Sequence, residues 1–66
     1  MYIVIELQKN ADGHVSNIVT EHTNQAEAES KYHSILASAA VSTIPIHSAI
    51  IVSEEGFPVV HKCYKH

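Results

Sequence analysis

One four-residue turn signature occurs twice in this chain, at Asn10–Gly13 and again at Ser53–Gly56. Both copies begin with a small polar residue, have an acidic residue third and glycine fourth, and separate two apolar runs of the kind that form strands. The pattern is typical of a type I turn closed by a glycine in the left-handed conformation, the common three-residue loop of a β-hairpin. The chain is therefore predicted to contain two hairpins, one near each end.

The segment between the two hairpins has the periodicity of a helix. Asn24 can cap its first turn, and Glu27 stands three residues later, which is the spacing of a capping box. Pro45 disfavours helical angles at the residue before it, so the helix is expected to end upstream. The apolar residues that recur at helical spacing, and that we expect to lie on the sheet, are Ala28, Tyr32, Ile35, Leu36 and Ala39.

The apolar runs on either side of the turns predict strands at residues 2–8, 14–22, 46–53 and 57–64. Together with the helix they predict one α+β domain over residues 1–66. Its expected architecture is a four-stranded antiparallel sheet (β-β-α-β-β along the chain) with one helix packed on one face.

The size and charge of the chain restrict its partners. A core built from 66 residues supplies only about 3–5 kcal/mol of net stability, and a single cysteine cannot form an intrachain disulfide. We therefore expect a homo-oligomer, a dimer or larger. The net charge is −3, with four lysines and no arginine, so duplex nucleic acid and anionic membranes are not expected as partners. No secretion signal or membrane span is evident, which predicts a cytoplasmic protein, and no cofactor is expected.

The first turn predicts which residues of the first hairpin share a face. Counting outward from residues 11–13 pairs Leu7 with Asn17 and Ile5 with Val19, and directly opposed residues lie on the same side of a sheet. The more aliphatic side, expected under the helix, holds Ile3, Ile5, Leu7, Val15 and Val19. The other side holds Tyr2, Val4, Glu6, Ile18, Thr20 and His22.

The second turn predicts the faces of the second hairpin, provided that its ladder is regular. Phe57 then opposes Ser53, and the pairs further along are Ile51 with Val59, Ala49 with His61, and His47 with Cys63. The side expected under the helix holds Ile46, Ile50, Val52, Val60 and Tyr64. A shift of one residue in either register would exchange the faces.

A single helix covers only one side of such a sheet, so the opposite side is expected to be an interface or a ligand surface. The residues predicted on this uncovered side are Tyr2, Val4, Ile18, His22, His47, Ala49, Ile51, Phe57, Val59 and His61, with Cys63 beside them.

Histidine and cysteine are the residue types on this side that could bind a metal ion or react. The predicted register places His47, His61 and Cys63 together, and these three are the candidate ligands for zinc or copper. No CxxC or HxxxH spacing occurs in the chain, so structural roles are favoured. Cys63 has no evident orienting carboxylate or glycine-rich oxyanion loop, and the phosphate-binding motifs GxGxxG and GxxxxGK are absent. We expect no catalytic residue and no enzymatic activity.

Six stretches of the chain show a resemblance to known sequences: Met1–Gln8, Asn10–Gly13, Asn17–Val19, Ala28–His33, Ile35–Ser42 and Glu55–Tyr64. They resemble a group of short uncharacterised proteins encoded by phages and prophages of gut bacteria, and the likeness spans almost the whole chain. The resemblance implies a viral accessory origin and a location in the cytoplasm of the bacterial host. It implies no particular activity and no site residues.

These observations together predict a non-enzymatic phage or prophage accessory protein that self-associates through its uncovered sheet face and acts by binding. Two alternatives stay open. One is a sponge that sequesters a nucleotide-like host signal at a subunit interface, where tyrosines stack on the base and histidines contact phosphate. The other is an accessory protein of virion or tail assembly.

Overall fold

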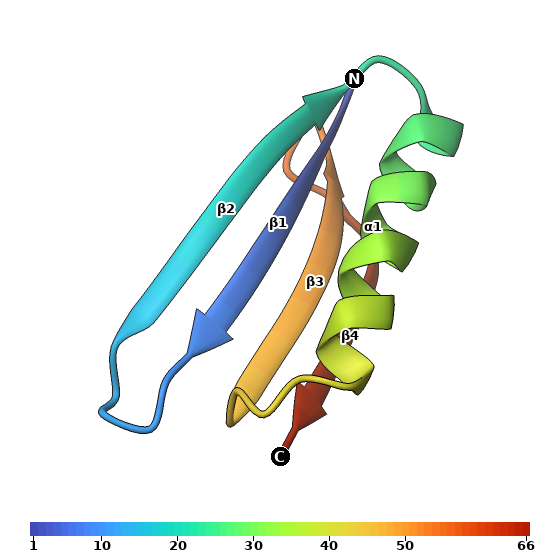
Figure 1. Cartoon of the computed structure of the whole chain (residues 1–66). Coiled ribbons are helices and arrows are strands. Elements are labelled where there is room, and N and C mark those ends of the chain that lie inside the picture. The colour runs from blue at the N-terminus through green and yellow to red at the C-terminus, as the bar shows by residue number, and fades with distance from the viewer.

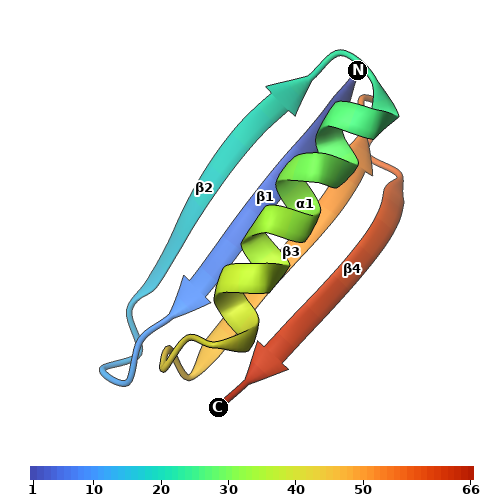
Figure 2. The same cartoon turned by 45° about the vertical axis from the view of Figure 1, so that its right-hand side comes forward.

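A computed structural model describes all 66 residues of the chain (Figure 1). Its elements, in chain order, are β1 (Tyr2–Lys9), β2 (Val15–His22), α1 (Gln25–Ala40), β3 (Ile46–Ser53) and β4 (Pro58–Lys65). The four strands form one antiparallel sheet in the order β2-β1-β3-β4, and α1 lies across one face of it (Figure 2). The predicted α+β fold class is therefore confirmed.

Both predicted turns are present, and both depend on glycine. Gly13 and Gly56 have φ angles of 89° and 87°, in the left-handed region that residues with a side chain rarely adopt. The Gly13 N–H donates to the carbonyl of Asn10 at 3.0 Å, and the Gly56 N–H donates to the carbonyl of Ser53 at 2.9 Å. The two reversals are thus set by local backbone chemistry.

The register of the first hairpin is the predicted one, but the second hairpin contains a β-bulge. Val52 pairs with Pro58 and Ile51 pairs with Val60, so Val59 is the extra residue on β4. Pro58 has no N–H to give to a ladder, and such positions are where strands become irregular.

The bulge shifts every later pair of the second hairpin by one residue. Ala49 faces Lys62 and His47 faces Tyr64. The predicted pairs of Ile51 with Val59, Ala49 with His61 and His47 with Cys63 are therefore wrong, because the ladder is not regular.

The helix begins at its predicted cap and buries its predicted stripe. The side-chain oxygen of Asn24 accepts a hydrogen bond from the Glu27 N–H at 2.9 Å, and the Asn24 amide donates to the Glu27 carboxylate at 3.3 Å. The residues of α1 that are buried against the sheet are Ala28, Tyr32, Ile35 and Ala39, with Leu36 partly buried.

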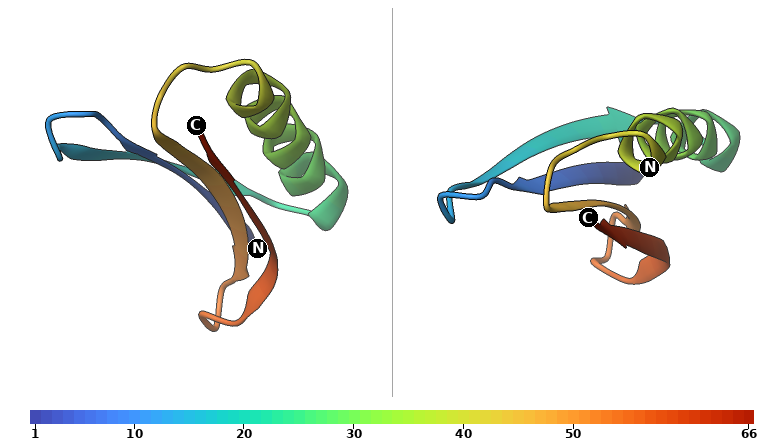
Figure 3. Two further views of the ribbon diagram at one scale, coloured as in Figure 1. Left: turned by 90° about the horizontal axis from the view of Figure 1, so that it is seen from below. Right: turned by 60° about the horizontal axis from the view of Figure 1, so that its bottom comes forward.

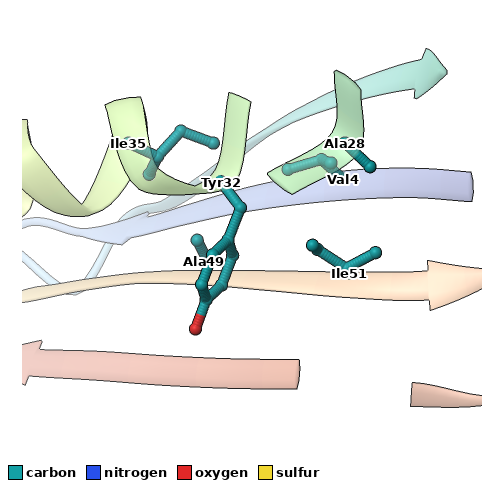
Figure 4. Close-up of a cluster of buried hydrophobic side chains, with 6 residues drawn as sticks. All are labelled: Val4, Ala28, Tyr32, Ile35, Ala49 and Ile51. Atoms are coloured by element: carbon teal, nitrogen blue, oxygen red, sulfur yellow. The ribbon is translucent and has the colours of Figure 1, made fainter. Parts of the chain in front are cut away.

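The hydrophobic core lies between α1 and the two central strands. Val4 from β1 and Ala49 and Ile51 from β3 pack against the helix stripe (Figure 4). The ring of Tyr32 lies against the small side chain of Ala49, with its hydroxyl directed toward β4 (Figure 4). Because this core is a single thin layer of a few residues, it stabilises one chain only modestly.

The connection from β2 to β3 passes over β1. Both strands are antiparallel to β1 and hence parallel to each other, and the helix between them crosses in the right-handed sense (Figure 2). Viewed from below, the sheet is visibly twisted and α1 lies entirely on one side of it (Figure 3). This helix lacks both the length and the apolar character needed to cross a membrane.

Removing the helix cap should destabilise the fold. Asn24→Ala leaves the Glu27 N–H without its acceptor, and we expect the free energy of unfolding to fall by about 1 kcal/mol. Urea unfolding at one fixed protein concentration measures this loss. Ser30→Ala, on the exposed side of α1, is the matched control and should change stability by less than about 0.5 kcal/mol. Equal effects of the two substitutions would show that the cap is not needed.

Candidate interaction surface

The structure reverses the predicted faces of β1, β2 and β3. In β4 the bulge restores the predicted faces from Val60 onward, so Val60 and Tyr64 lie on the helix side as expected, paired with Ile51 and His47. Four residues predicted on the uncovered side lie under α1 instead. The exposed fractions are 1% for Val4, 3% for His47, 1% for Ala49 and 0% for Ile51.

Side chains alternate along a strand, so Tyr2 lies on the same side of β1 as Val4. On β2, Thr20 is paired with Val4, and Ile18 and His22 lie on the same side as Thr20. All three residues are therefore on the helix side. The prediction that these residues face away from the helix is therefore wrong.

The physical reason for the reversal is the hand of the connection between β2 and β3. The Asn10 N–H donates to the carbonyl of His14 at 2.9 Å, which makes the even-numbered residues of β2 the ones that hydrogen-bond to β1. In a strand of L-residues, the edge toward which a residue directs its N–H and C=O groups also determines the sheet face on which its side chain lies. A right-handed crossover from β2 over β1 to β3 passes over that face.

The sheet surface opposite α1, called here the uncovered face, is rich in aliphatic side chains. Its central members are Ile5, which is paired with both Val19 and Ile50, and Ile3, which is paired with Val52. The exposed fractions of Leu7, Val15 and Val19 are 38%, 53% and 54%. The complete aliphatic set of the uncovered face is Ile3, Ile5, Leu7, Val15, Val19, Ile46, Ile50 and Val52.

Charged residues on the uncovered face lie at its two ends, with opposite signs. At one end Lys9 and Lys65 both pair with Ile46. At the other end Glu21 pairs with Ile3. Between these ends the face is mainly aliphatic, with the uncharged polar residues Asn17 and Ser48 on either side of Leu7 and with His61 beside Ile50. The face is positive at one end and negative at the other.

The candidate metal ligands do not come together. His61 and Cys63 remain on the uncovered face, since they pair with Ile50 and Ser48, whereas His47 lies on the opposite side beneath α1. No group of three or more His, Cys, Asp or Glu side chains in this chain is arranged to hold a metal ion. The predicted grouping of His47, His61 and Cys63 is therefore wrong.

The other predicted site residues on the second hairpin have separate positions. Phe57 is exposed in the turn between β3 and β4, and Val59 is exposed as the bulge residue. With Tyr2 and His22 on the helix side, His61 is the one histidine of the strands that lies on the uncovered face. The grouping of tyrosines and histidines that favoured a nucleotide ligand is absent from this face, and the nucleotide alternative stays a prediction.

A buried acid–base pair lies beneath the helix, and it was not predicted. The Glu6 carboxylate lies 2.6 Å from His47 Nε2, and the two side chains are 14% and 4% exposed. The same carboxylate accepts a hydrogen bond from the Gln8 amide at 2.9 Å, while His47 Nδ1 has no partner. Glu6 and His47 are 41 residues apart and belong to neighbouring strands, so only knowledge of the strand order could have brought them together.

The environment of Glu6 favours its charged form. Burial acts to raise the pKa of Glu6, but the hydrogen bonds from His47 and Gln8 outweigh it, and the charges of His47 and Lys31 add to them. The pKa of Glu6 is consequently lowered from 4.5. Both side chains of this pair are largely buried beneath the helix.

Comparison with protein-family models, with curated proteins and with solved structures finds no match. The resemblance to phage and prophage proteins stays a prediction.

Replacing Glu6 should remove an acid-sensitive part of the stability. A carboxyl group whose pKa is lowered by folding stabilises the folded chain above its unfolded pKa, here 4.5, and this contribution disappears as the pH falls through the lower folded pKa. The free energy of unfolding lost in Glu6→Gln should therefore be largest above about pH 5 and should shrink toward pH 3.

Urea unfolding of both proteins across this pH range provides the measurement. Glu55→Gln, in an exposed turn, is the control and should behave like the wild type throughout. A difference between wild type and Glu6→Gln that is constant from pH 7 to pH 3 would contradict the assigned pKa direction.

Proposed function

We propose that this chain is a non-enzymatic binding protein that self-associates through the uncovered face. The observation that supports this proposal is the set of aliphatic side chains opposite α1, which no element of the chain covers (Figure 3). Monomeric proteins rarely leave a contiguous apolar surface of this kind in water, and larger exposed patches mark contact sites. The resemblance to phage and prophage proteins supports an accessory role for such a binder.

The area of the uncovered face is sufficient for a small specific interface. Strands of eight residues cover about 26 Å at ~3.3 Å per residue, and four strands cover about 19 Å at ~4.8 Å spacing. The face therefore measures about 500 Å² in each copy, and a pair would bury about 1,000 Å², the lower limit for specific interfaces. A thin core and a face of this size together favour a second copy as the partner.

The charges at the two ends favour one orientation of the two copies. A two-fold axis across the strands places the Glu21 end of one copy over the Lys9 end of the other. A two-fold axis along the strands would place the ends with Lys9 and Lys65 together, so like charges would repel. We therefore propose that the two sheets stack with their strands running in opposite directions, in the aligned manner of a β-sandwich.

The positions of the reactive groups support binding over catalysis. Glu6 and His47, the closest carboxylate and imidazole, are enclosed beneath α1. Cys63 lies on the uncovered face, which the proposed partner occupies, and its thiol lies 3.9 Å from the carbonyl of Tyr64. Neither arrangement presents a nucleophile with an activating base to a substrate.

A lysine placed on the uncovered face should reduce self-association. Light scattering of the wild type at about 100 μM should give at least twice the 7.3 kDa chain mass. Leu7→Lys should halve that mass, because a lysine ammonium in an apolar interface loses its hydration without gaining a partner. Circular dichroism should show that the variant keeps its secondary structure.

The matched control for this substitution is Val41→Lys. Val41 is 83% exposed at the end of α1, away from the uncovered face, so this variant should retain the wild-type mass. A wild-type protein that stays at 7.3 kDa, or a folded Leu7→Lys variant with unchanged mass, would refute the proposal.

A further inference from the structure

The sheet has two edge strands, and they differ in how well they are protected. In the order β2-β1-β3-β4 the free edges are β2 and β4 (Figure 2). A free edge presents unpaired backbone N–H and C=O groups and can pair with another strand. Proteins block such edges with proline, lysine and β-bulges, and β4 has all three, in Pro58, Lys62, Lys65 and the bulge at Val59.

The β2 edge has none of these protections. Its sequence from Val15 to His22 contains no proline and no lysine, its pairing with β1 is regular, and its one carboxylate is Glu21. Ile18 on this strand is 53% exposed on the helix side, beyond the cover of α1. We propose that the β2 edge pairs antiparallel with the β2 edge of a second copy, which joins the two sheets into one continuous eight-stranded sheet.

The backbone geometry determines the register of this pairing. Since the even-numbered residues of β2 bond to β1, the odd-numbered residues Val15, Asn17, Val19 and Glu21 direct their N–H and C=O groups outward. A two-fold axis at Ile18 pairs Asn17 with Val19 of the second copy and Val15 with Glu21. With the axis at Ile18, each of the four outward residues pairs with an outward residue of the second copy. With the axis at Asn17 or Val19, one outward residue has no partner in the β2 strand of the second copy.

Ile18 is the residue at which the two copies are closest. In this register it stands opposite its own copy in a non-hydrogen-bonded pair, where Cα atoms are about 4.5 Å apart and side chains touch. Ser16 stands opposite Thr20 of the second copy in a pair of the same kind. The Ser16 residues of the two copies are therefore separated by four residues along the strand direction, which is about 13 Å.

This edge pairing is independent of the stacking proposed above, because the edge and the uncovered face are different surfaces of the sheet. Edge pairing leaves both helices on the same side and joins two uncovered faces into one. Each of the two contacts can therefore be tested without the other.

Disulfide trapping tests the register directly. In a Cys63→Ser background, Ile18→Cys should form a disulfide-linked dimer under mild oxidation at least tenfold faster than Ser16→Cys or Thr20→Cys, since Cα atoms more than 7 Å apart cannot be bridged. An equimolar mixture of Ser16→Cys and Thr20→Cys chains should cross-link to each other. The products are separated by mass spectrometry, and circular dichroism verifies folding.

The same experiment distinguishes the edge from the uncovered face. Adding Leu7→Lys to the Ile18→Cys chain should leave the cross-linking rate within about twofold, because Leu7 is not on the β2 edge. The edge proposal is overturned if Ile18→Cys reacts no faster than Ser16→Cys, if the Ser16→Cys and Thr20→Cys mixture stays uncross-linked, or if Leu7→Lys abolishes the reaction of Ile18→Cys.

Discussion

The right-handed connection from β2 through α1 to β3 decides which side of this sheet becomes the core. Each residue of a strand directs its N–H and C=O groups toward one edge of the sheet and its side chain toward one face. For L-residues, chirality determines which face goes with which edge. The first turn makes the even-numbered residues of β2 bond to β1, and β3 lies beyond β1. A right-handed crossover then passes over the even-numbered side chains, so Val4 and not Ile5 occupies the core.

This constraint leaves the larger aliphatic surface outside the single chain. The helix covers a small apolar patch at Val4, Ala49 and Ile51, and next to it lies the Glu6–His47 pair. Ile3, Ile5, Leu7 and Ile50 belong to the other side of the same strands. The thin layer beneath the helix is the only internal core, and a core of this size gives a small domain little stability. Burying the aliphatic side chains of the uncovered face would add to that stability. The proposed self-association is therefore a consequence of the hand of one crossover.

The sequence was sufficient to predict features that depend on neighbouring residues. Gly13 and Gly56 marked both turns because only glycine readily adopts a positive φ, and Asn24 with Glu27 marked the helix start. The faces could not be assigned in this way, since they depend on the strand order, which is not local. Once β2-β1-β3 is known, the first turn and the crossover rule give the correct faces. Pro58 was the one local sign of the bulge that shifted the register of β4.

The central claim is that the uncovered face is buried between copies in solution, and methyl NMR with a soluble paramagnetic agent tests it on the unmodified protein. The account predicts that the methyl groups of Ile5, Leu7 and Ile50 are shielded from the agent nearly as well as those of Val4 and Ile51. Strong relaxation of the first group, with Val4 and Ile51 alone protected, would show that the face remains in water and would contradict the account.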